Sequence, residues 1–81
     1  MSLFHERLRI CRQTKNMSQE DIAHELHIRY STYCRYERGG TEPTISDAAR
    51  IADYFGVSLD YLAGRTERQE PWPWPDAPQN Q

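Results

Sequence analysis

Apolar side chains recur along most of the chain at the three- and four-residue spacing that places them on one face of an α-helix. Phe4, Leu8 and Cys11 have this spacing and predict a first helix from about residue 3 to 14. Ile22 and Leu26 predict a second helix over residues 19–26, and a third follows over residues 30–38. The pattern continues in a fourth and a short fifth helix, with apolar positions at Ile45, Ala48, Ala49, Ala52 and Phe55 and then at Leu59 and Leu62.

Capping residues and glycines mark the ends of these segments. Ser18, Thr44 and Ser58 each precede a helix, where a hydroxyl oxygen accepts a hydrogen bond from an unpaired backbone N–H group. Gly39 and Gly56 follow the third and fourth segments, and glycine readily adopts the left-handed conformation that ends a helix. The sequence therefore predicts a compact all-α fold of five helices.

The C-terminal part of the chain has a different composition. Beyond Arg65 it is polar and then reads Pro71-Trp72-Pro73-Trp74-Pro75, which lacks the backbone donors and the free φ angles that a helix needs. We therefore expect a helical domain over residues 1–64 and an extended or partly disordered tail over residues 65–81.

Length and composition restrict the function classes. A chain of 81 residues holds one domain, and it contains no apolar run of the roughly 20 residues that cross a bilayer and no secretory signal. Its two cysteines, Cys11 and Cys34, do not suggest a disulfide framework. These features predict a soluble, cytoplasmic protein with no membrane partner.

The charge is unevenly distributed. A net charge of −2 disfavours nucleic acid at first sight, because Lys and Arg side chains neutralise phosphates. However, residues 1–40 carry seven of the ten basic side chains against five acidic ones, whereas residues 41–81 carry three against seven. The N-terminal half therefore has the charge to face DNA while the other half faces away.

The second and third helical segments are short and joined by about three residues, which is the arrangement of a helix-turn-helix. The chain also resembles the phage Cro and repressor (XRE-like) family of helix-turn-helix transcriptional regulators in four motifs: Ser18–Ala23, Tyr36–Gly39, Pro43 and Gly56–Leu62. The resemblance covers roughly residues 4–64. It implies a five-helix domain of the phage repressor type that binds double-stranded DNA of a defined sequence, with two copies on a palindromic operator.

The resemblance also assigns roles to single residues. It places four base-reading positions on the third helix: Tyr30, Ser31, Thr32 and Arg35. An arginine at such a position can bond O6 and N7 of guanine, whereas Ser31 and Thr32 equally suit helix capping. Gln19 matches the glutamine that holds a phosphate at the start of the second helix. The other candidate phosphate contacts, each also readable as a solvated surface cation, are Arg9, Lys15, Arg29 and Arg38.

Other matched positions concern the structure of the domain. Arg12 and Glu37 match a family ion pair that bridges the first and third helices, and Tyr33 and Tyr36 fall at packing positions. His27 stands in the turn where the family has glycine, and the left-handed conformation costs a non-glycine residue roughly 1 to 2 kcal/mol. We therefore expect the turn to be shifted or strained.

A homodimer is expected on DNA, because one recognition helix reads too few base pairs to be selective in a genome. The surface for a second copy should lie at the end of the domain away from the third helix, since a five-residue helix has little capacity to bury several large side chains. The candidates are Tyr54, Leu59, Tyr61, Leu62, Trp72 and Trp74.

Other function classes have less support. No glycine-rich phosphate loop, nucleophile motif or carboxylate pair indicates an enzyme, and no cofactor is expected. His24 and His27, with Cys34 or His5, lack a recognised ligand spacing, so we expect surface histidines and no metal site. Cys34, beside Arg35, is the candidate for a redox-sensing thiol. The main alternative is an antitoxin or adaptor of the same fold whose Pro-Trp tail binds a second protein, a toxin or an effector.

Overall fold

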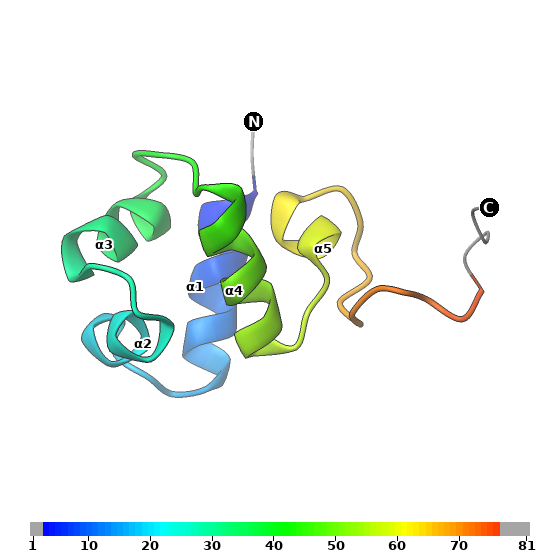
Figure 1. Ribbon diagram of the computed structural model, residues 1–81, viewed down its shortest axis with the longest axis horizontal. Helices are drawn as coiled ribbons and strands as arrows, with labels where there is room; N and C mark the ends of the chain where they lie inside the picture. Colours follow the sequence, from blue (N-terminus) through cyan, green and yellow to red (C-terminus); the bar gives the residue numbers. More distant parts are fainter. Residues whose placement is uncertain (1–2, 77–81) are drawn as a thin grey trace.

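The computed structural model describes residues 3–76, in which five helices are joined by short connections (Figure 1). In chain order they are α1 (Phe4–Thr14), α2 (Gln19–Leu26), α3 (Tyr30–Arg38), α4 (Ile45–Phe55) and α5 (Leu59–Ala63). The first helix begins one residue later than predicted. The described residues contain no β-strand, so the all-α fold class is confirmed.

Side-chain caps and left-handed residues explain where the helices begin and end. Ser18, Thr44 and Ser58 accept hydrogen bonds from backbone N–H groups three residues further on, at 3.0, 3.0 and 2.9 Å. Arg29, which precedes α3, makes no such side-chain bond. His27 ends α2 with φ of 57° and ψ of 40°, the conformation in which the family has glycine. The turn is therefore strained rather than shifted.

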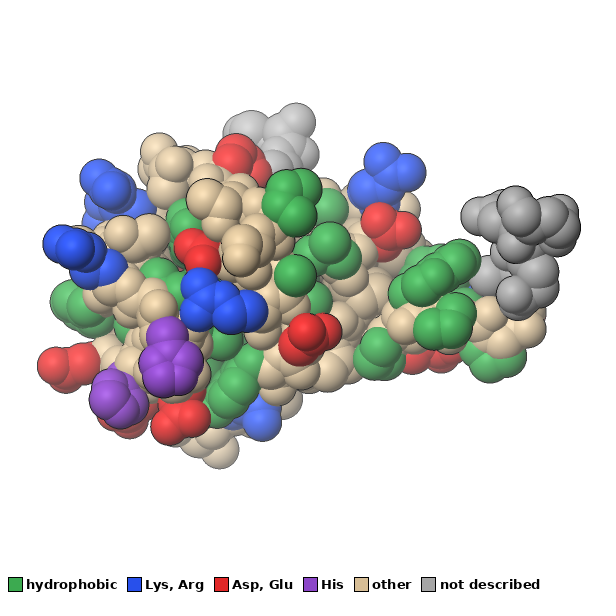
Figure 2. Space-filling view, viewed as in Figure 1, with side chains coloured by type: hydrophobic (Ala, Val, Ile, Leu, Met, Phe, Trp, Pro, Cys, Tyr) green, Lys and Arg blue, Asp and Glu red, His purple; other side chains and the backbone are tan. Residues whose placement is uncertain are grey.

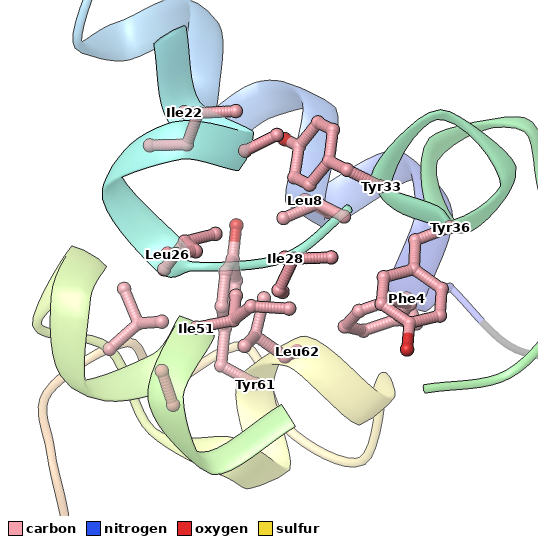
Figure 3. Close-up of a cluster of buried hydrophobic side chains, with 13 residues drawn as sticks. Phe4, Leu8, Ile22, Leu26, Ile28, Tyr33, Tyr36, Ile51, Tyr61 and Leu62 are labelled. Carbon is pink, nitrogen blue, oxygen red and sulfur yellow. The ribbon is translucent and has the colours of Figure 1, made fainter. Parts of the chain in front are cut away.

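All five helices contribute to one hydrophobic core (Figure 3). Each supplies one fully buried large side chain, in chain order Leu8, Ile22, Tyr33, Ile51 and Leu62. Ile28, in the turn between α2 and α3, is also buried. Since the turn itself supplies a core side chain, the angle between α2 and α3 is fixed by packing.

The buried face of α4 is rotated from the predicted one. Ile45 is 82% exposed and Ala49 is exposed, whereas Ile51, which the predicted stripe left out, is fully buried. The side chains of α4 that belong to the core or pack against it have helical spacing as well, and they are Ile51, Ala52, Tyr54 and Phe55. This face places a large branched side chain at the centre of the helix and leaves the first turn of α4 outside the core.

The tail begins by returning to the helical domain. Arg7, only 7% exposed, donates hydrogen bonds from Nη1 to the backbone oxygens of Tyr61 and Thr66, each at 2.6 Å. The backbone N–H of Ser58 donates to the Gln69 oxygen at 2.7 Å. Residues 65–76 contain no helix or strand and extend from the body at the end opposite α2 and α3 (Figure 1). The part of the predicted tail after residue 76 lies outside the described residues.

Candidate DNA-binding surface

The third helix presents two different faces. Tyr30, Ser31 and Arg35 are exposed, and Tyr30 retains 53% of its surface. Thr32 is half-buried, at the edge of this face. The opposite face, with Tyr33 and Tyr36, is buried in the core, as expected for packing positions. The base-reading candidates therefore share one face of α3, with Thr32 the least accessible of them.

Glu37, at the end of α3, forms the centre of a hydrogen-bond network. It is 4% exposed, and its carboxylate accepts bonds from Arg12 Nε at 2.6 Å and Arg12 Nη2 at 3.0 Å. The Tyr33 hydroxyl donates to Glu37 Oε2 at 2.5 Å, and Gln19 Nε2 donates to Oε1 at 3.1 Å. The Arg12–Glu37 pair is therefore part of a larger network that joins α1, α2 and α3.

This network sets the ionisation of Glu37. Burial raises the pKa of Glu37, but the hydrogen bonds from Arg12, Tyr33 and Gln19 and the Arg12 charge outweigh that effect, so the pKa lies below its ordinary value. Burial and the bond to the carboxylate raise the pKa of the Tyr33 hydroxyl. Near neutral pH, Glu37 is therefore an anion and Tyr33 a neutral donor.

Gln19 is more constrained than a solvated residue of a first helical turn. Its Nε2 donates to Glu37, and its Oε1 accepts from the Cys34 thiol with a sulfur–oxygen distance of 3.7 Å. The side chain is therefore held at the junction of α2 and α3, beside the exposed face of α3. Cys34 is half-buried and participates in this contact.

Two of the predicted phosphate contacts lie next to Gln19. An open hollow between α1, α2 and α3 is lined by Arg9, Arg12, Gln19, Cys34, Glu37 and Arg38. Arg9 and Arg38 are exposed, so their charges are available at its rim. A cationic rim beside the N-terminus of α2, where backbone N–H groups are unpaired, suits an anionic ligand.

The other two predicted phosphate contacts lie elsewhere. The Lys15 ammonium is 5.2 Å from the centre of the Tyr54 ring on α4, and Lys15 is not among the residues that line the hollow. Arg29 precedes α3 and is exposed. The structure therefore groups Arg9, Arg38 and Gln19 and places Lys15 toward α4.

Contacts that sequence reasoning missed hold α4 against the helix-turn-helix. The Tyr36 hydroxyl donates to Asp47 Oδ2 at 2.6 Å, and Arg50 donates to the Leu26 backbone oxygen at the end of α2. Arg50 also pairs with Asp47. No local motif predicts the bonds from Tyr36 to Asp47 and from Arg50 to Leu26, because the residues that they join lie 11 and 24 positions apart in the sequence.

The candidates for a dimer surface divide into two groups. Tyr61 and Leu62 are 6% and 1% exposed and pack in their own core, so they have little surface left for a second copy. Leu59 is 42% exposed and Trp72 is 59% exposed, while Tyr54 and Trp74 are half-buried.

Two further findings concern other functions. Among residues 3–76, no group of three or more His, Cys, Asp or Glu side chains has a geometry suited to a metal ion. Within the same range, no helix has the length and apolar character required to cross a bilayer.

The arrangement is that of a helix-turn-helix DNA-binding domain. On the face shown in Figure 2, basic side chains lie at the α3 end of the molecule, and hydrophobic side chains are exposed on the tail at the other end. A family model described as helix-turn-helix matches residues 8–62. The chain belongs to the phage Cro and repressor-like (XRE-like) helix-turn-helix family of transcriptional regulators.

Several curated relatives have similar sequences. The chain is 37% identical over 67 residues to the SPbeta prophage-derived uncharacterized HTH-type transcriptional regulator YonR of Bacillus subtilis, covering 83% of this chain and 62% of the relative. It is 38% identical over 60 residues to the uncharacterized HTH-type transcriptional regulator YqaE of the same organism, covering 74% and 52%. It is 37% identical over 65 residues to the cryptic phage CTXphi transcriptional repressor RstR of Vibrio cholerae, covering 80% and 58%.

The chain thus spans about half to three-fifths of the length of these relatives. No solved structure matches the chain significantly.

Proposed function

We propose that this chain binds double-stranded DNA of a defined sequence and represses transcription from a palindromic operator as a homodimer. The observation that carries the proposal is the exposed face of α3, bordered by a cationic hollow at the start of α2. Membership of the family supports it, as does the similarity to the repressor RstR. Residues 1–64 form the DNA-binding unit in this proposal.

Each exposed group has a chemical role in the proposed complex. Arg35 bonds O6 and N7 of a guanine, and the Tyr30 ring contacts a thymine methyl group. Gln19, Arg9 and Arg38 hold phosphates and fix the position of α3 in the major groove without selecting sequence. The two copies then place their α3 helices about 34 Å apart, one helical turn of DNA.

Selection of duplexes from a random pool with the chain alone tests the proposal. We expect an enriched palindrome whose affinity falls steeply with salt, because bound cations are released from the DNA. Arg9→Ala and Arg38→Ala should each reduce the slope of log affinity against log salt by about 1. Failure to enrich any duplex at low salt would refute the proposal, as would binding that is independent of salt.

Arg35→Ala tests the assignment of base reading. We expect it to lower discrimination at one base pair of each half-site by about 1 to 3 kcal/mol. Arg65→Ala is a matched control, because it removes the same charge from an exposed arginine beyond α5. A uniform loss on all sequences from Arg35→Ala would instead assign Arg35 to a phosphate.

One observation favours the alternative of a partner-binding adaptor, namely the exposed Trp72 on the tail. Large aromatic side chains are typical anchors at protein interfaces. A chain that selects no duplex but retains its fold would favour this alternative over the repressor.

A further inference from the structure

Residues 65–76, which we name the arm, have an internal structure built around Arg68. The Arg68 Nη2 donates to Glu70 at 2.9 Å and pairs with Asp76 at 2.7 Å. Its guanidinium carbon lies 4.7 Å from the centre of the Trp74 ring, and Trp74 Nε1 donates to the Glu70 backbone oxygen at 2.7 Å. Contacts within the arm therefore hold its conformation, and Trp74 takes part in them.

Trp72 is the side chain of the arm that remains available. It is 59% exposed, and its ring packs edge-on against Trp74 with centroids 5.3 Å apart. The contacts that attach the arm to the body involve residues that precede Trp72. Arg7 donates a hydrogen bond to the Thr66 backbone oxygen, and Ser58 donates to the backbone oxygens of Arg68 and Gln69. The end of the arm extends away from the helical body (Figure 1).

The body has an apolar groove with an open face, which we name the α4–α5 groove. It lies between the start of α1, the first turns of α4 and the exposed side of α5. Its apolar lining consists of Phe4, Pro43, Ile45, Ala48, Leu59, Leu62 and Ala63. Ile45 and Leu59 are 82% and 42% exposed at this groove. Such side chains are the kind that a protein partner covers.

An arm does not reach the groove of its own chain in this conformation. Gln69, at the base of the arm, lines a hollow with Phe55 and Val57, at the C-terminal end of α4. The groove lies at the N-terminal end of the same helix, beside Thr44 and Ile45. The two ends of this eleven-residue helix are about 16 Å apart, since an α-helix rises 1.5 Å per residue.

We propose that, in the homodimer of the proposed function, Trp72 of each copy inserts into the α4–α5 groove of the other. Each of the two copies supplies one arm and one groove, so the exchange is reciprocal about a two-fold axis. The inference rests on the proposed dimer and names its interface. It leaves Tyr61 out of the interface, whereas Leu62 lines the groove that Trp72 enters.

The expected interface is small. A tryptophan side chain buries about 150 to 250 Å². Because Trp72 exposes 59% of its surface, each insertion buries at most about 150 Å² of the side chain. Two such insertions and the groove surfaces that they cover amount to at most about 600 Å², below the roughly 1,200 to 2,000 Å² of a stable complex. The free protein should therefore dimerise weakly, and two adjacent half-sites should strengthen the contact by raising the local concentration of the second copy.

Sedimentation equilibrium of the full chain, with and without substitutions, tests the exchange. Trp72→Ala disables the arm, and Ile45→Glu disables the groove at a position that is too exposed to support the core. Each variant alone should have a dimer dissociation constant raised by tenfold or more. Ala49→Glu is the matched control, because Ala49 is an exposed apolar side chain on the same helix that lines neither the groove nor the hollow beside Gln69.

Mixing the two variants distinguishes exchange from packing within one chain. A heterodimer regains one intact contact, the arm of the Ile45→Glu chain in the groove of the Trp72→Ala chain. The mixture should therefore dimerise more tightly than either variant alone. Tryptophan emission should shift to shorter wavelength as dimer forms, since Trp72 and Trp74 are the two tryptophans of the chain.

Three results would overturn the exchange. They are a dimer dissociation constant of Trp72→Ala equal to that of the wild type, an equal effect of Ala49→Glu and Ile45→Glu, and a mixture that dimerises no more tightly than its components. Each is independent of whether the chain selects a DNA sequence. If the wild-type chain selects no duplex, the proposed function fails even where sedimentation shows arm exchange. If it selects a palindrome and Trp72→Ala dimerises normally, only the exchange fails.

Discussion

Replacing Glu37 with Gln tests the network that joins α1, α2 and α3. The carboxylate accepts hydrogen bonds from donors of Arg12, Tyr33 and Gln19. A Gln amide has one acceptor oxygen, so in either orientation its NH₂ group faces donors that have lost their partner. Breaking a buried ion pair in this way costs about 3 to 5 kcal/mol.

We expect the lower end of that range, about 3 kcal/mol, because Arg12 keeps its hydrogen bond to the Met17 backbone oxygen at 2.9 Å. Urea unfolding followed by circular dichroism measures the loss near neutral pH. Glu25→Gln is the matched control, since Glu25 lies exposed on α2, and a surface substitution of this kind changes stability by about 0.5 kcal/mol or less. A loss from Glu37→Gln no larger than the control would refute the reasoning.

The same variant predicts a pH dependence with a defined sign. The pKa of Glu37 in the folded protein lies below its ordinary value of 4.5, so the ionised form stabilises the fold at pH values above 4.5. This contribution is lost as the pH falls through the lower folded pKa. The gap in stability between wild type and Glu37→Gln should therefore narrow below pH 4.5. A gap that stays constant between pH 7 and pH 3 would contradict the assigned ionisation.

Two further predictions concern the backbone and the arm. His27→Gly should stabilise the protein by about 0.5 to 1 kcal/mol in urea unfolding, because it removes the strain of a left-handed non-glycine residue. Asn16→Gly should raise the stability by less, because asparagine tolerates φ of 58° better. A decrease in stability of His27→Gly would contradict the assigned strain. Arg7→Met should release the arm and accelerate hydrogen exchange of the Ser58 amide, which donates to Gln69, whereas unchanged exchange would show that Arg7 does not hold it.

The helix bounds were predictable because their signals are local. A capping hydroxyl acts on an N–H group three residues away, as Ser18 and Thr44 do. The rotation of α4 was missed because both candidate faces have helical spacing, and the choice between Ile45 and Ile51 depends on what packs against the helix. Local pattern therefore determined the elements better than it determined their orientation.

The burial of Arg7 and of Tyr61 was missed for the same reason. Arg7 has the pattern of a surface arginine, but its partners lie 54 and 59 residues away, so its burial has no local signal. Tyr61 was assigned to a partner on the assumption that a five-residue helix buries little. The structure buries Tyr61 under Arg7, whose guanidinium lies 4.3 Å from the centre of its ring. The long-range contacts of Arg7 therefore explain why Tyr61 is buried in its own domain rather than left on the surface.

Gln19 connects the stability network to the proposed DNA contact. A glutamine amide has two N–H donors, and Glu37 accepts from Nε2. In the proposed complex the second N–H is directed by this bond toward a phosphate, and a side chain that is already held loses less entropy on binding. Gln19→Ala should therefore weaken all DNA sequences by a similar factor and lower stability by about 1 kcal/mol, since Glu37 loses one donor.

These two effects are separable. A domain of ordinary stability stays almost wholly folded after a loss of about 1 kcal/mol, so a smaller folded fraction does not explain weaker binding. Titration of the selected duplex and of a scrambled one, with stability measured in parallel, gives both quantities. An unchanged affinity in a destabilised variant would limit Gln19 to the network with Glu37, and a loss confined to the selected duplex would make it a base contact.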